Sequence, residues 1–578
     1  MKLVIAEKPS VAMSIAKVLG VKDKKDGYIE GNGYIVSWCL GHLIQMANPE
    51  QYDDQYSKWN IEDLPIIPNE YLYDVSKSTK KQYQVLKKLL TSKTISEVIN
   101  ACDAGREGEL IFRLVYNQSK SILPIKRLWI SSLEDQAIQE GFKNLKRGEN
   151  YNHLYQSALA RAKADWLIGM NMSRLYSCLY RQHYSVGRVQ TPVLAMIVDR
   201  DESIKNFKKE KYYVGELNLG SFTLSTGRMY NYEIVEDLVY QAIGTNIKIT
   251  DVIKKEKTTR PDLLYDLTTL QREANRYFGL SAKDTLDIAQ KLYEQKLITY
   301  PRTDSRYLSN DMIISTVNSI LGKYDFDTSR IKEVFNSEKV TDHHAIIPTS
   351  SSMEYDLSKL NTKEKNIYDL ILNKTYASFG YPLKEITTKI IYVYEVQGDT
   401  YEFTTNGKVV VDEGFTKYLK QYKKESKEEI LSDVNVGDTF EVINKEIKEK
   451  FTSPPKHYTE ESILKAMEIA GTEFIDKEVE VERKGLGTPA TRAGIIETLI
   501  LKGFIIREKK NHLVTEKGIQ LITIVADFLK NANTTAIWEM KLYDISIGKF
   551  SEQEFLKEIE DTIKSTIQLY EIVKKKSE

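Results

Sequence analysis

The stretch SEVINACDAGREGELIFRLVYNQ, residues 96–118, decides the fold of the N-terminal part of the chain. A short apolar run is followed by an acid, two glycines and a helical pattern, which is typical of a buried strand that leads into a helix. A similar unit begins the chain, where KLVIA at 2–6 precedes the helical pattern SVAMSIAKVLG at 10–20, with Ser10 as the expected N-cap. Two such units predict a mostly parallel sheet covered by helices over residues 1–150.

The rest of the chain alternates between helical and strand-rich segments. At 578 residues it is too long for one hydrophobic core, so we expect roughly three or four domains. The order helical, strand-rich, helical, strand-rich, helical predicts that the chain passes out through one domain and returns through it. Within the second strand-rich segment, the Asn-Gly pair at 406–407 is typical of a hairpin turn. The segments cover residues 151–200, 211–260, 261–296, 382–446 and 447–578.

Composition excludes several classes of protein. No apolar run approaches the roughly 18 residues that a membrane span needs, so we expect a soluble protein without a membrane partner. Lysine plus arginine equal aspartate plus glutamate at 82 each, so net charge neither indicates nor excludes a polyanionic partner. Cys39, Cys102 and Cys178 are too few for a disulfide framework or a four-cysteine zinc site, and they fit a reducing cytoplasm.

Three acids stand where a parallel sheet gathers functional groups. Glu7 directly follows the first strand and Asp103 ends the later one, and the carboxyl ends of parallel strands meet at one edge of a sheet. Glu107 is four residues past Asp103, which brings it toward the same side in the first turn of the next helix. Three carboxylates facing one point predict a magnesium site. Alternatively, Asp103 caps the helix, and Glu107 and Glu109 are first-turn charges that favour its dipole.

The segment LITYPRTDSR, residues 297–306, presents a tyrosine and an arginine together. Pro301 favours an extended backbone at Tyr300, and in an extended chain Tyr300 and Arg302 point the same way, with Asp304 beyond them. A phenol needs nearby positive charge to act as a nucleophile, and arginine also stabilises the negative charge that develops at a phosphoryl centre. The alternative is a half-buried tyrosine in a loop beside a solvated arginine, since the chain holds 36 tyrosines.

Three further segments have residues suited to phosphate. TDHHAIIPT holds His343 and His344, and adjacent residues on a strand point to opposite faces, so one of them is a candidate hydrogen-bond donor to phosphate. SVGRVQTPVL and KGLGTPATRAGII could hold a phosphate before a helix start, although such segments usually form only a turn and a cap. No G-x-x-x-x-G-K-[ST] stretch occurs, which disfavours a P-loop ATPase. The candidates in the two glycine-containing segments are Gly187, Arg188, Gln190, Thr191, Gly485, Gly487, Thr488, Thr491 and Arg492.

Taken together, these segments resemble the type IA DNA topoisomerases, and most closely bacterial topoisomerase III. The resemblance covers nearly the whole chain, because nine motifs occur in consistent order. One motif could arise by chance, but nine in order hardly could. The motifs are IAEKPSVA, GHL at 41–43, DAGREGELI, RAKADWLIGMN, SVGRVQTP, LLYDLTTLQREA, ITYPRTDSRYL, HHAIIPT and KGLGTPATRAGII.

The resemblance implies a multidomain fold with α/β, α and β parts. An N-terminal Toprim α/β domain is followed by a toroidal type IA topoisomerase core around a central hole of the size of DNA. The chain passes out and back through two of these domains, consistent with the alternation above. The implied domains are Toprim domain I at 1–150, helical domain IV at 151–215 and 447–578, strand-rich arch domain II at 216–263 and 382–446, and helical domain III with the tyrosine at 264–381.

The resemblance also implies catalytic roles for individual residues. Tyr300 resembles the nucleophile that attacks a single-strand phosphodiester and keeps the 5′ phosphate, and Arg302 matches an arginine that contacts that phosphate. Glu7 and Lys8 lie where proton transfer to the 3′ oxygen is expected, and His343 matches a histidine near the scissile phosphate. The implied Mg²⁺ ligands are Glu7, Asp103 and Glu107, and the implied DNA contacts are Ser185, Val186, Gly187, Arg188, Val189, Gln190, Arg174, Trp59, Thr491 and Arg492.

The implied function is ATP-independent, Mg²⁺-dependent cleavage of one DNA strand through a 5′-phosphotyrosine intermediate, followed by strand passage and rejoining. This activity relaxes negative supercoils and decatenates DNA, and it needs single-stranded or underwound DNA because the scissile strand must be unpaired. We expect a monomeric cytoplasmic enzyme associated with the bacterial nucleoid, with a helicase as a candidate partner. A Toprim-type primase or nuclease that uses the same acids is the alternative.

The sequence departs from the family pattern in two ways. Many members carry an aspartate two places after the first one, whereas this chain has Gly105, so one metal ligand is missing. The cysteine-rich zinc modules of many relatives have no counterpart among these 578 residues, which hold three cysteines. We therefore expect fewer metal ligands and less efficient relaxation of duplex DNA than in relatives with these features.

Overall fold

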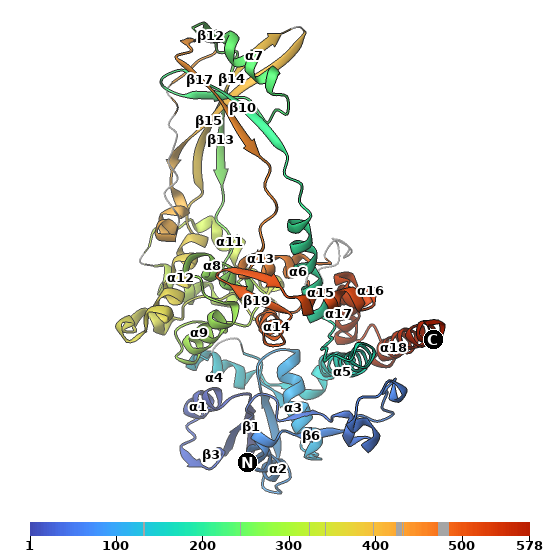
Figure 1. The fold of residues 1–578 in the computed structure, drawn as a ribbon. Coiled ribbons are helices and arrows are strands. Elements are labelled where there is room, and N and C mark those ends of the chain that lie inside the picture. The colour runs from blue at the N-terminus through green and yellow to red at the C-terminus, as the bar shows by residue number, and fades with distance from the viewer. Residues whose placement is uncertain are drawn as a thin grey trace.

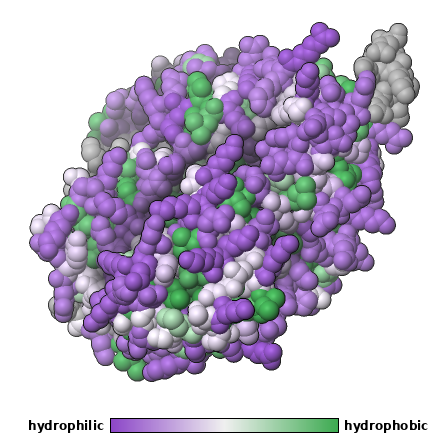
Figure 2. Space-filling view, turned by 90° about the horizontal axis from the view of Figure 1, so that it is seen from below, coloured by the Kyte–Doolittle hydropathy of each residue, from purple (hydrophilic) through white to green (hydrophobic). Residues whose placement is uncertain are grey.

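The computed structural model shows an N-terminal α/β region at the base of the molecule, helical regions above it and a strand-rich region at the top (Figure 1). The structure describes residues 1–130, 133–242, 244–322, 324–340, 343–396, 398–422, 431, 433–471 and 485–577. Within these ranges no helix is long and apolar enough to cross a membrane. The face seen from below is mainly hydrophilic, with its apolar side chains in scattered groups (Figure 2).

A seven-stranded sheet forms the centre of the N-terminal region, in the order β2-β3-β4-β1-β7-β8-β9. Its four central strands, β4, β1, β7 and β8, are parallel, and the outer pairs are antiparallel. The predicted parallel pairing is therefore confirmed for the four central strands, while three of the six pairings in the sheet are antiparallel. The strands are β1 (Lys2–Ala6), β2 (Asp23–Lys25), β3 (Tyr28–Gly31), β4 (Tyr34–Trp38), β7 (Glu97–Ala101), β8 (Ile125–Arg127) and β9 (Lys146–Arg147), and β5 (Ile44–Met46) pairs with β6 (Tyr73–Val75) in a separate two-stranded sheet.

Helices cover both faces of the seven-stranded sheet because successive strand residues point to opposite sides. Val4 and Ala6 of β1 share a core with α1 and α4, whereas Leu3 and Ile5 share a core with α2 and α3. β1 is therefore buried on both faces in the middle of the region, and Glu7 follows directly at its carboxyl end. The helices are α1 (Pro9–Val18), α2 (Lys80–Leu90), α3 (Arg106–Gln118) and α4 (Asp135–Lys143).

The chain leaves the helical regions for the strand-rich region twice and returns twice (Figure 1). It goes out from α6 along β10 and comes back along β13 to α8; it goes out again from α12 along β14 and comes back along β17 to α13. This path agrees with the alternation of segments in the sequence. The helices on it are α5 (Asn152–Tyr180), α6 (Gln190–Lys205), α7 (Tyr232–Ala242), α8 (Leu267–Phe278), α9 (Ala282–Glu294), α10 (Ile313–Thr316), α11 (Ile331–Val334) and α12 (Thr362–Ser378).

The strand-rich region is an antiparallel sheet of six strands, in the order β13-β14-β15-β11-β10-β17. Its neighbours come from both passages of the chain, since β13 pairs with β14 and β10 pairs with β17. The two passages are thereby joined into one sheet. The strands are β10 (Lys211–Asn218), β11 (Thr223–Ser225), β13 (Asp251–Thr259), β14 (Leu383–Val396), β15 (Asp399–Asp412) and β17 (Asn444–Phe451), with β12 (Asn246–Lys248) and β16 (Thr439–Glu441) as a separate pair.

The C-terminal helices pack on α5 and α6, which are far away in the sequence. Leu167 of α5, Leu542 of α17 and Ile563 of α18 belong to one buried core. This helical region is therefore built from two segments of the chain, while the domain boundaries given above stay a prediction. Its remaining elements are β18 (Tyr458–Thr459), α13 (Glu460–Ile469), α14 (Pro489–Leu501), β19 (Ile505–Glu508), β20 (Asn511–Val514), α15 (Glu516–Ile524), α16 (Asp527–Lys530), α17 (Ala532–Ser546) and α18 (Glu552–Ser577).

Two local predictions are wrong. Ser10 is not an N-cap, because α1 begins at Pro9 and Ser10 lies in its first turn. Proline suits that first position, since its missing amide hydrogen would have no partner there. The Asn406-Gly407 pair does not form a turn but lies inside β15, opposite Lys389 and Thr388 of β14. The pairing of the two long strands outweighs the local preference of Asn-Gly.

Candidate active site

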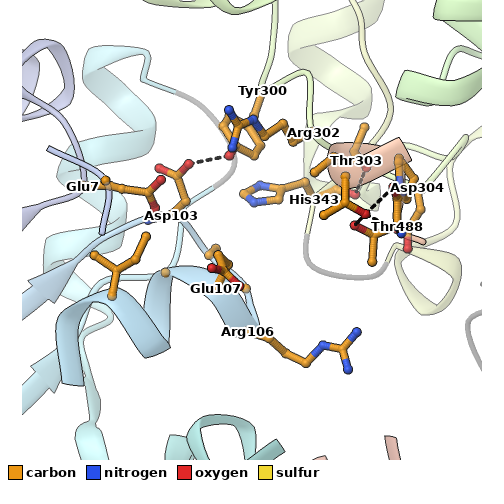
Figure 3. A pocket seen from close by; sticks show the side chains of 18 of the residues that line it. Glu7, Asp103, Arg106, Glu107, Tyr300, Arg302, Thr303, Asp304, His343 and Thr488 are labelled. Atoms are coloured by element: carbon orange, nitrogen blue, oxygen red, sulfur yellow. Dashed lines mark hydrogen bonds between the residues drawn. The ribbon is translucent and has the colours of Figure 1, made fainter. Parts of the chain in front are cut away.

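Tyr300 lies in a non-helical segment that follows α9. The backbone of this segment is anchored by Thr299, whose N–H donates to the carbonyl of Ile347 at 2.9 Å and whose hydroxyl donates to the carbonyl of Ala345 at 3.0 Å. The Tyr300 side chain is 6% exposed, and its hydroxyl donates a hydrogen bond to Asp103 (Figure 3). The fold thus brings the predicted nucleophile into contact with one of the predicted acids.

In the free protein Tyr300 is a neutral phenol. Burial raises its pKa well above the usual value, the charges of Asp103 and Glu7 raise it further, and Arg302 opposes them. Added positive charge beside the phenol would therefore favour its ionisation. Such charge is what a nucleophilic tyrosine requires.

His343 packs against the Tyr300 ring. Their ring centroids are 4.4 Å apart, and the Thr303 hydroxyl donates to the His343 carbonyl at 2.8 Å, which ties the two segments together. Burial lowers the pKa of His343 to about 3, so the imidazole is neutral at neutral pH. His344 makes a hydrogen bond to the Ala345 carbonyl instead, as expected for neighbours that point to opposite faces. A neutral imidazole has one N–H that can donate to a phosphate oxygen.

Glu7 and Asp103 meet at the carboxyl ends of the neighbouring parallel strands β1 and β7, as the sequence predicts. The Asp103 N–H donates to the Glu7 carboxylate at 3.3 Å. Burial and then the charge of Asp103 raise the pKa of Glu7 to about 7, and Lys8 and Arg302 offset this only in part. The two acids form a crowded like-charged pair, which a cation would relieve.

Two neighbours fix the backbone of Asp103. A Cβ added to Gly108 of α3 would lie 2.1 Å from the Asp103 carbonyl oxygen, so only glycine lets the helix come this close. The buried Arg127 donates to the same carbonyl at 2.7 Å and is neutralised by Glu109 at 3.2 Å. The N-cap position of α3 is Gly105, so the alternative in which Asp103 caps this helix is wrong.

Glu107 faces the same pocket but contacts His42 rather than the two acids. This contact raises the pKa of His42, although burial opposes it. Across the part of the chain that the structure describes, no three His, Cys, Asp or Glu side chains are grouped closely enough to hold a metal ion. The donor chemistry of Glu7, Asp103 and Glu107 still fits Mg²⁺, because all three are carboxylates and two of them already crowd each other.

These groups open into one pocket whose walls come from parts of the chain that are remote in sequence (Figure 3). The segment that precedes α14 forms part of the pocket wall. Its Gly485 packs tightly against α13, since a Cβ added to Gly485 would lie 1.9 Å from the Met467 carbonyl oxygen. Arg161 of α5 closes another side. The main polar residues of the lining are Glu7, Lys8, His42, Asp103, Arg106, Glu107, Arg161, Tyr300, Arg302, Thr303, Asp304, His343, Thr488 and Thr491.

Family models account for most of the chain. The DNA topoisomerase model matches residues 149–557, and the Toprim domain model matches residues 2–133. The chain belongs to the type IA DNA topoisomerase family. The predicted resemblance is confirmed, and a primase or nuclease is not favoured.

Individual relatives of this topoisomerase agree with the family models. The chain is 41% identical to DNA topoisomerase 3 of Bacillus licheniformis, over 98% of this chain and 81% of that protein. DNA topoisomerase 3 of Bacillus subtilis is 39% identical over the same shares. Full-length topoisomerase I from Thermotoga maritima has a similar structure, with a TM-score of 0.75 and 25% identity over 97% of this chain and 90% of that chain. The predicted type IA topoisomerase fold with an N-terminal Toprim domain is confirmed, while the central hole stays a prediction.

The predicted DNA-contacting arginines of the topoisomerase are buried in this conformation. Arg188 forms ion pairs inside the protein, Arg174 donates to the Tyr56 carbonyl at 2.9 Å, and Arg492 donates to the Thr268 hydroxyl at 2.7 Å. Trp59 and Thr491 are exposed, whereas Val186 is buried and Ser185, Gly187, Val189 and Gln190 are partly buried. Contact with DNA remains a prediction for all ten residues, and for Arg174 and Arg492 it requires a change of partner.

Three basic residues of the pocket received no role from the sequence. His42, Arg106 and Arg161 all line it. Each stands inside a motif on which the resemblance rests, namely GHL, DAGREGELI and RAKADWLIGMN. The motifs contained these residues, but the spacing alone did not show that they face one cavity.

Proposed function

We propose that this topoisomerase cleaves one DNA strand with Tyr300 as the nucleophile. The observation that best supports this proposal is the hydrogen bond from the Tyr300 hydroxyl to Asp103, in a pocket that Glu7, Lys8 and Arg302 also line. The phenolic oxygen attacks phosphorus, the bond from phosphorus to the 3′ oxygen breaks, and the 5′ phosphate stays on the tyrosine. One phosphodiester is exchanged for another, so rejoining by the reverse step needs no ATP.

The contacts suggest how the protons move. The Tyr300 hydroxyl already donates to Asp103, so a carboxylate is in place to accept its proton during attack. Glu7 and Lys8 both line the pocket where the leaving 3′ oxygen takes a proton. Lys8 is the donor when Mg²⁺ is bound, because Glu7 is ionised as a ligand of the ion. During rejoining both protons return.

Two buried donors are available to the scissile phosphate. Nε of Arg302 and Nδ1 of His343 have no hydrogen-bond partner among the residues that the structure describes. Buried polar atoms are normally paired, so this pair of atoms supports a site for an absent ligand. A phosphate beside Tyr300 would accept a charge-assisted bond from Arg302, and a neutral one from His343 in the tautomer that carries its proton on Nδ1.

Glu7, Asp103 and Glu107 are the residues that would hold Mg²⁺, and Gly105 offers no further carboxylate. A bound magnesium ion would supply positive charge beside the phosphate. For Glu107 to join the other two acids, it must give up its contact with His42.

The proposal extends to strand passage after cleavage. A second strand passes through the break into a central hole of the toroid, which relaxes negative supercoils and decatenates DNA. The substrate is single-stranded or underwound DNA, because the scissile strand must be unpaired to reach Tyr300. We further propose the four-domain division given above, a monomeric state, a cytoplasmic site on the nucleoid and a helicase as a candidate partner.

Relaxation of negatively supercoiled plasmid with Mg²⁺ and without ATP tests the proposal. Tyr300→Phe should abolish relaxation, because only the attacking oxygen is lost. Tyr293→Phe is the matched control, since Tyr293 is a buried phenol whose ring lies 5.2 Å from that of Tyr300; it should retain most activity. Relaxation by Tyr300→Phe at the wild-type rate would refute the assignment.

A further inference from the structure

A cluster of arginines and acids lies against the active-site pocket. Arg106 at the start of α3, Arg161 in α5 and Arg188 before α6 all approach Glu539 of α17, with nitrogen-to-oxygen distances of 3.4, 3.9 and 3.0 Å. Asp165 is the second acid, 2.9 Å from Arg188 and 3.8 Å from Arg161. The cluster joins the N-terminal region to two parts of the helical region.

The positive charge of this cluster exceeds its negative charge, because three guanidinium groups face two carboxylates. Burial raises the pKa of Glu539, but Arg161, Arg188 and Arg106 together hold it well below its usual range, so Glu539 is ionised at neutral pH. Its side chain is 9% exposed and that of Arg188 is 3% exposed, so water screens these charges little. Both terminal nitrogens of Arg188 also lack a hydrogen bond of good geometry in the described part of the chain. Arg188 is therefore not fully satisfied by the protein.

Arg106 and Arg161 lie between Glu539 and the pocket. Both line the pocket that holds Tyr300 and Glu107, and their side chains are 17% and 19% exposed. Their charges also help to lower the pKa of Glu107 on the pocket side. Figure 3 shows Arg106 extending from α3 away from the Glu7 and Asp103 pair. The two arginines thus offer positive charge at a place apart from Tyr300.

We propose that Glu539 is the resting counter-ion of Arg106 and Arg161, and that a backbone phosphate of the bound DNA strand replaces it on these two arginines. The inference rests on the proposed function, because it requires a DNA strand in the pocket. Arg188 keeps its contacts with Asp165 and Glu539 and anchors the cluster. Glu539 acts through the arginines and is a positioning residue.

The exchange has a measurable consequence. In the wild type, the DNA phosphate displaces the Glu539 carboxylate from the two arginines. In a variant without this carboxylate, the phosphate instead displaces solution anions that are bound to the arginines. Release of bound ions makes DNA affinity depend on salt, with a slope of about 0.7 for each phosphate contact of a single strand. Glu539 therefore weakens DNA binding and makes it less sensitive to salt.

Binding of a fluorescent single-stranded oligonucleotide over a range of salt concentrations tests the inference, with the full-length chain in the Tyr300→Phe background. Glu539→Gln keeps the side-chain shape and removes the charge, so it should bind about tenfold more tightly at low salt. Its plot of log affinity against log salt should be steeper by up to about 0.7. Arg106→Gln and Arg161→Gln should each weaken binding and flatten the plot. In the double arginine variant, addition of Glu539→Gln should change neither value.

Glu460→Gln is the matched control. Glu460 is a buried acid that pairs with Arg507 at 3.2 Å and with His512 at 2.9 Å, and it does not line the pocket. Its affinity and salt plot should match those of the parent. Wild-type affinity and slope in a folded Glu539→Gln would overturn the inference; if that variant does not fold, unchanged slopes in Arg106→Gln and Arg161→Gln overturn it.

The two proposals fail in different ways. If the wild type forms a covalent DNA adduct but Glu539→Gln binds DNA as its parent does, only the counter-ion role is refuted. If the wild type forms no adduct at all, the proposed function fails, whatever the salt plots show.

Discussion

A single methyl group on α3 should displace Asp103 from Tyr300. In Gly108→Ala the new Cβ would lie 2.1 Å from the Asp103 carbonyl oxygen and 2.9 Å from its amide nitrogen, both far inside ordinary contact. The helix or the Asp103 loop must then move by about 1 Å, and such overpacking costs about 1–3 kcal/mol. The better helix propensity of alanine offsets less than about 1 kcal/mol of this. A displacement of about 1 Å at a catalytic group slows a reaction by about 100-fold.

The rate of covalent adduct formation with a single-stranded oligonucleotide, measured with Mg²⁺, should therefore fall by about 100-fold in Gly108→Ala. Gly494→Ala in α14 is the matched control, because an added Cβ there meets no atom within 4 Å. It should keep the wild-type rate and gain up to about 1 kcal/mol of stability. A wild-type rate in Gly108→Ala would show that α3 does not fix the position of Asp103.

Three other results are expected. Folding raises the pKa of Glu7 from 4.5 to about 7, so protonation of Glu7 stabilises the folded protein. This stabilisation is complete below about pH 4.5 and is lost as the pH rises through about 7. The free energy of unfolding falls by about 3 kcal/mol over this range. In EDTA, Glu7→Gln should thus have a higher Tm than the wild type at about pH 8 and the same Tm at about pH 4. Mg²⁺ should raise the Tm of the wild type more than that of Glu7→Gln. Equal Tm values of the two proteins in EDTA at about pH 8 would contradict this prediction. Arg302→Lys, which keeps the charge but loses the planar fork, should slow adduct formation by about 100-fold with little change in DNA affinity, and a normal rate would exclude Arg302 from the scissile phosphate. Trp59→Ala should weaken binding of single-stranded DNA by about 1–3 kcal/mol, because the exposed ring stacks on a base. Unchanged affinity would leave the ring a packing role against Arg174 and His183.

The meeting of Glu7 with Asp103 could be predicted because strand order alone determines it. Each acid follows a buried strand, and neighbouring parallel strands end at the same edge. The contact between Asp103 and Tyr300 could not be predicted in this way, since it joins two regions of the chain. Only the resemblance to the family placed these residues in one site before the structure did.

Arg188 shows where the sequence is insufficient. The motif SVGRVQTP identifies the segment, but the burial of Arg188 depends on Asp165 of α5 and Glu539 of α17. Nothing in the spacing of these residues indicates that α17 packs against α5. The wrong turn prediction for Asn406-Gly407 has the same cause. The two residues lie in a strand because of long-range pairing with β14, which their own turn preference does not indicate.

The most direct test of the central claim is to identify the residue that carries DNA after cleavage. The protein is incubated with Mg²⁺ and an oligonucleotide labelled at its 3′ or its 5′ end, and the covalent complex is trapped with denaturant. The protein is then digested with a protease, and the labelled peptide is analysed by mass spectrometry. We predict that label from the 3′ end, and not from the 5′ end, stays on the peptide that contains Tyr300. Label on another residue, or covalent attachment through the 3′ phosphate, would contradict this mechanism.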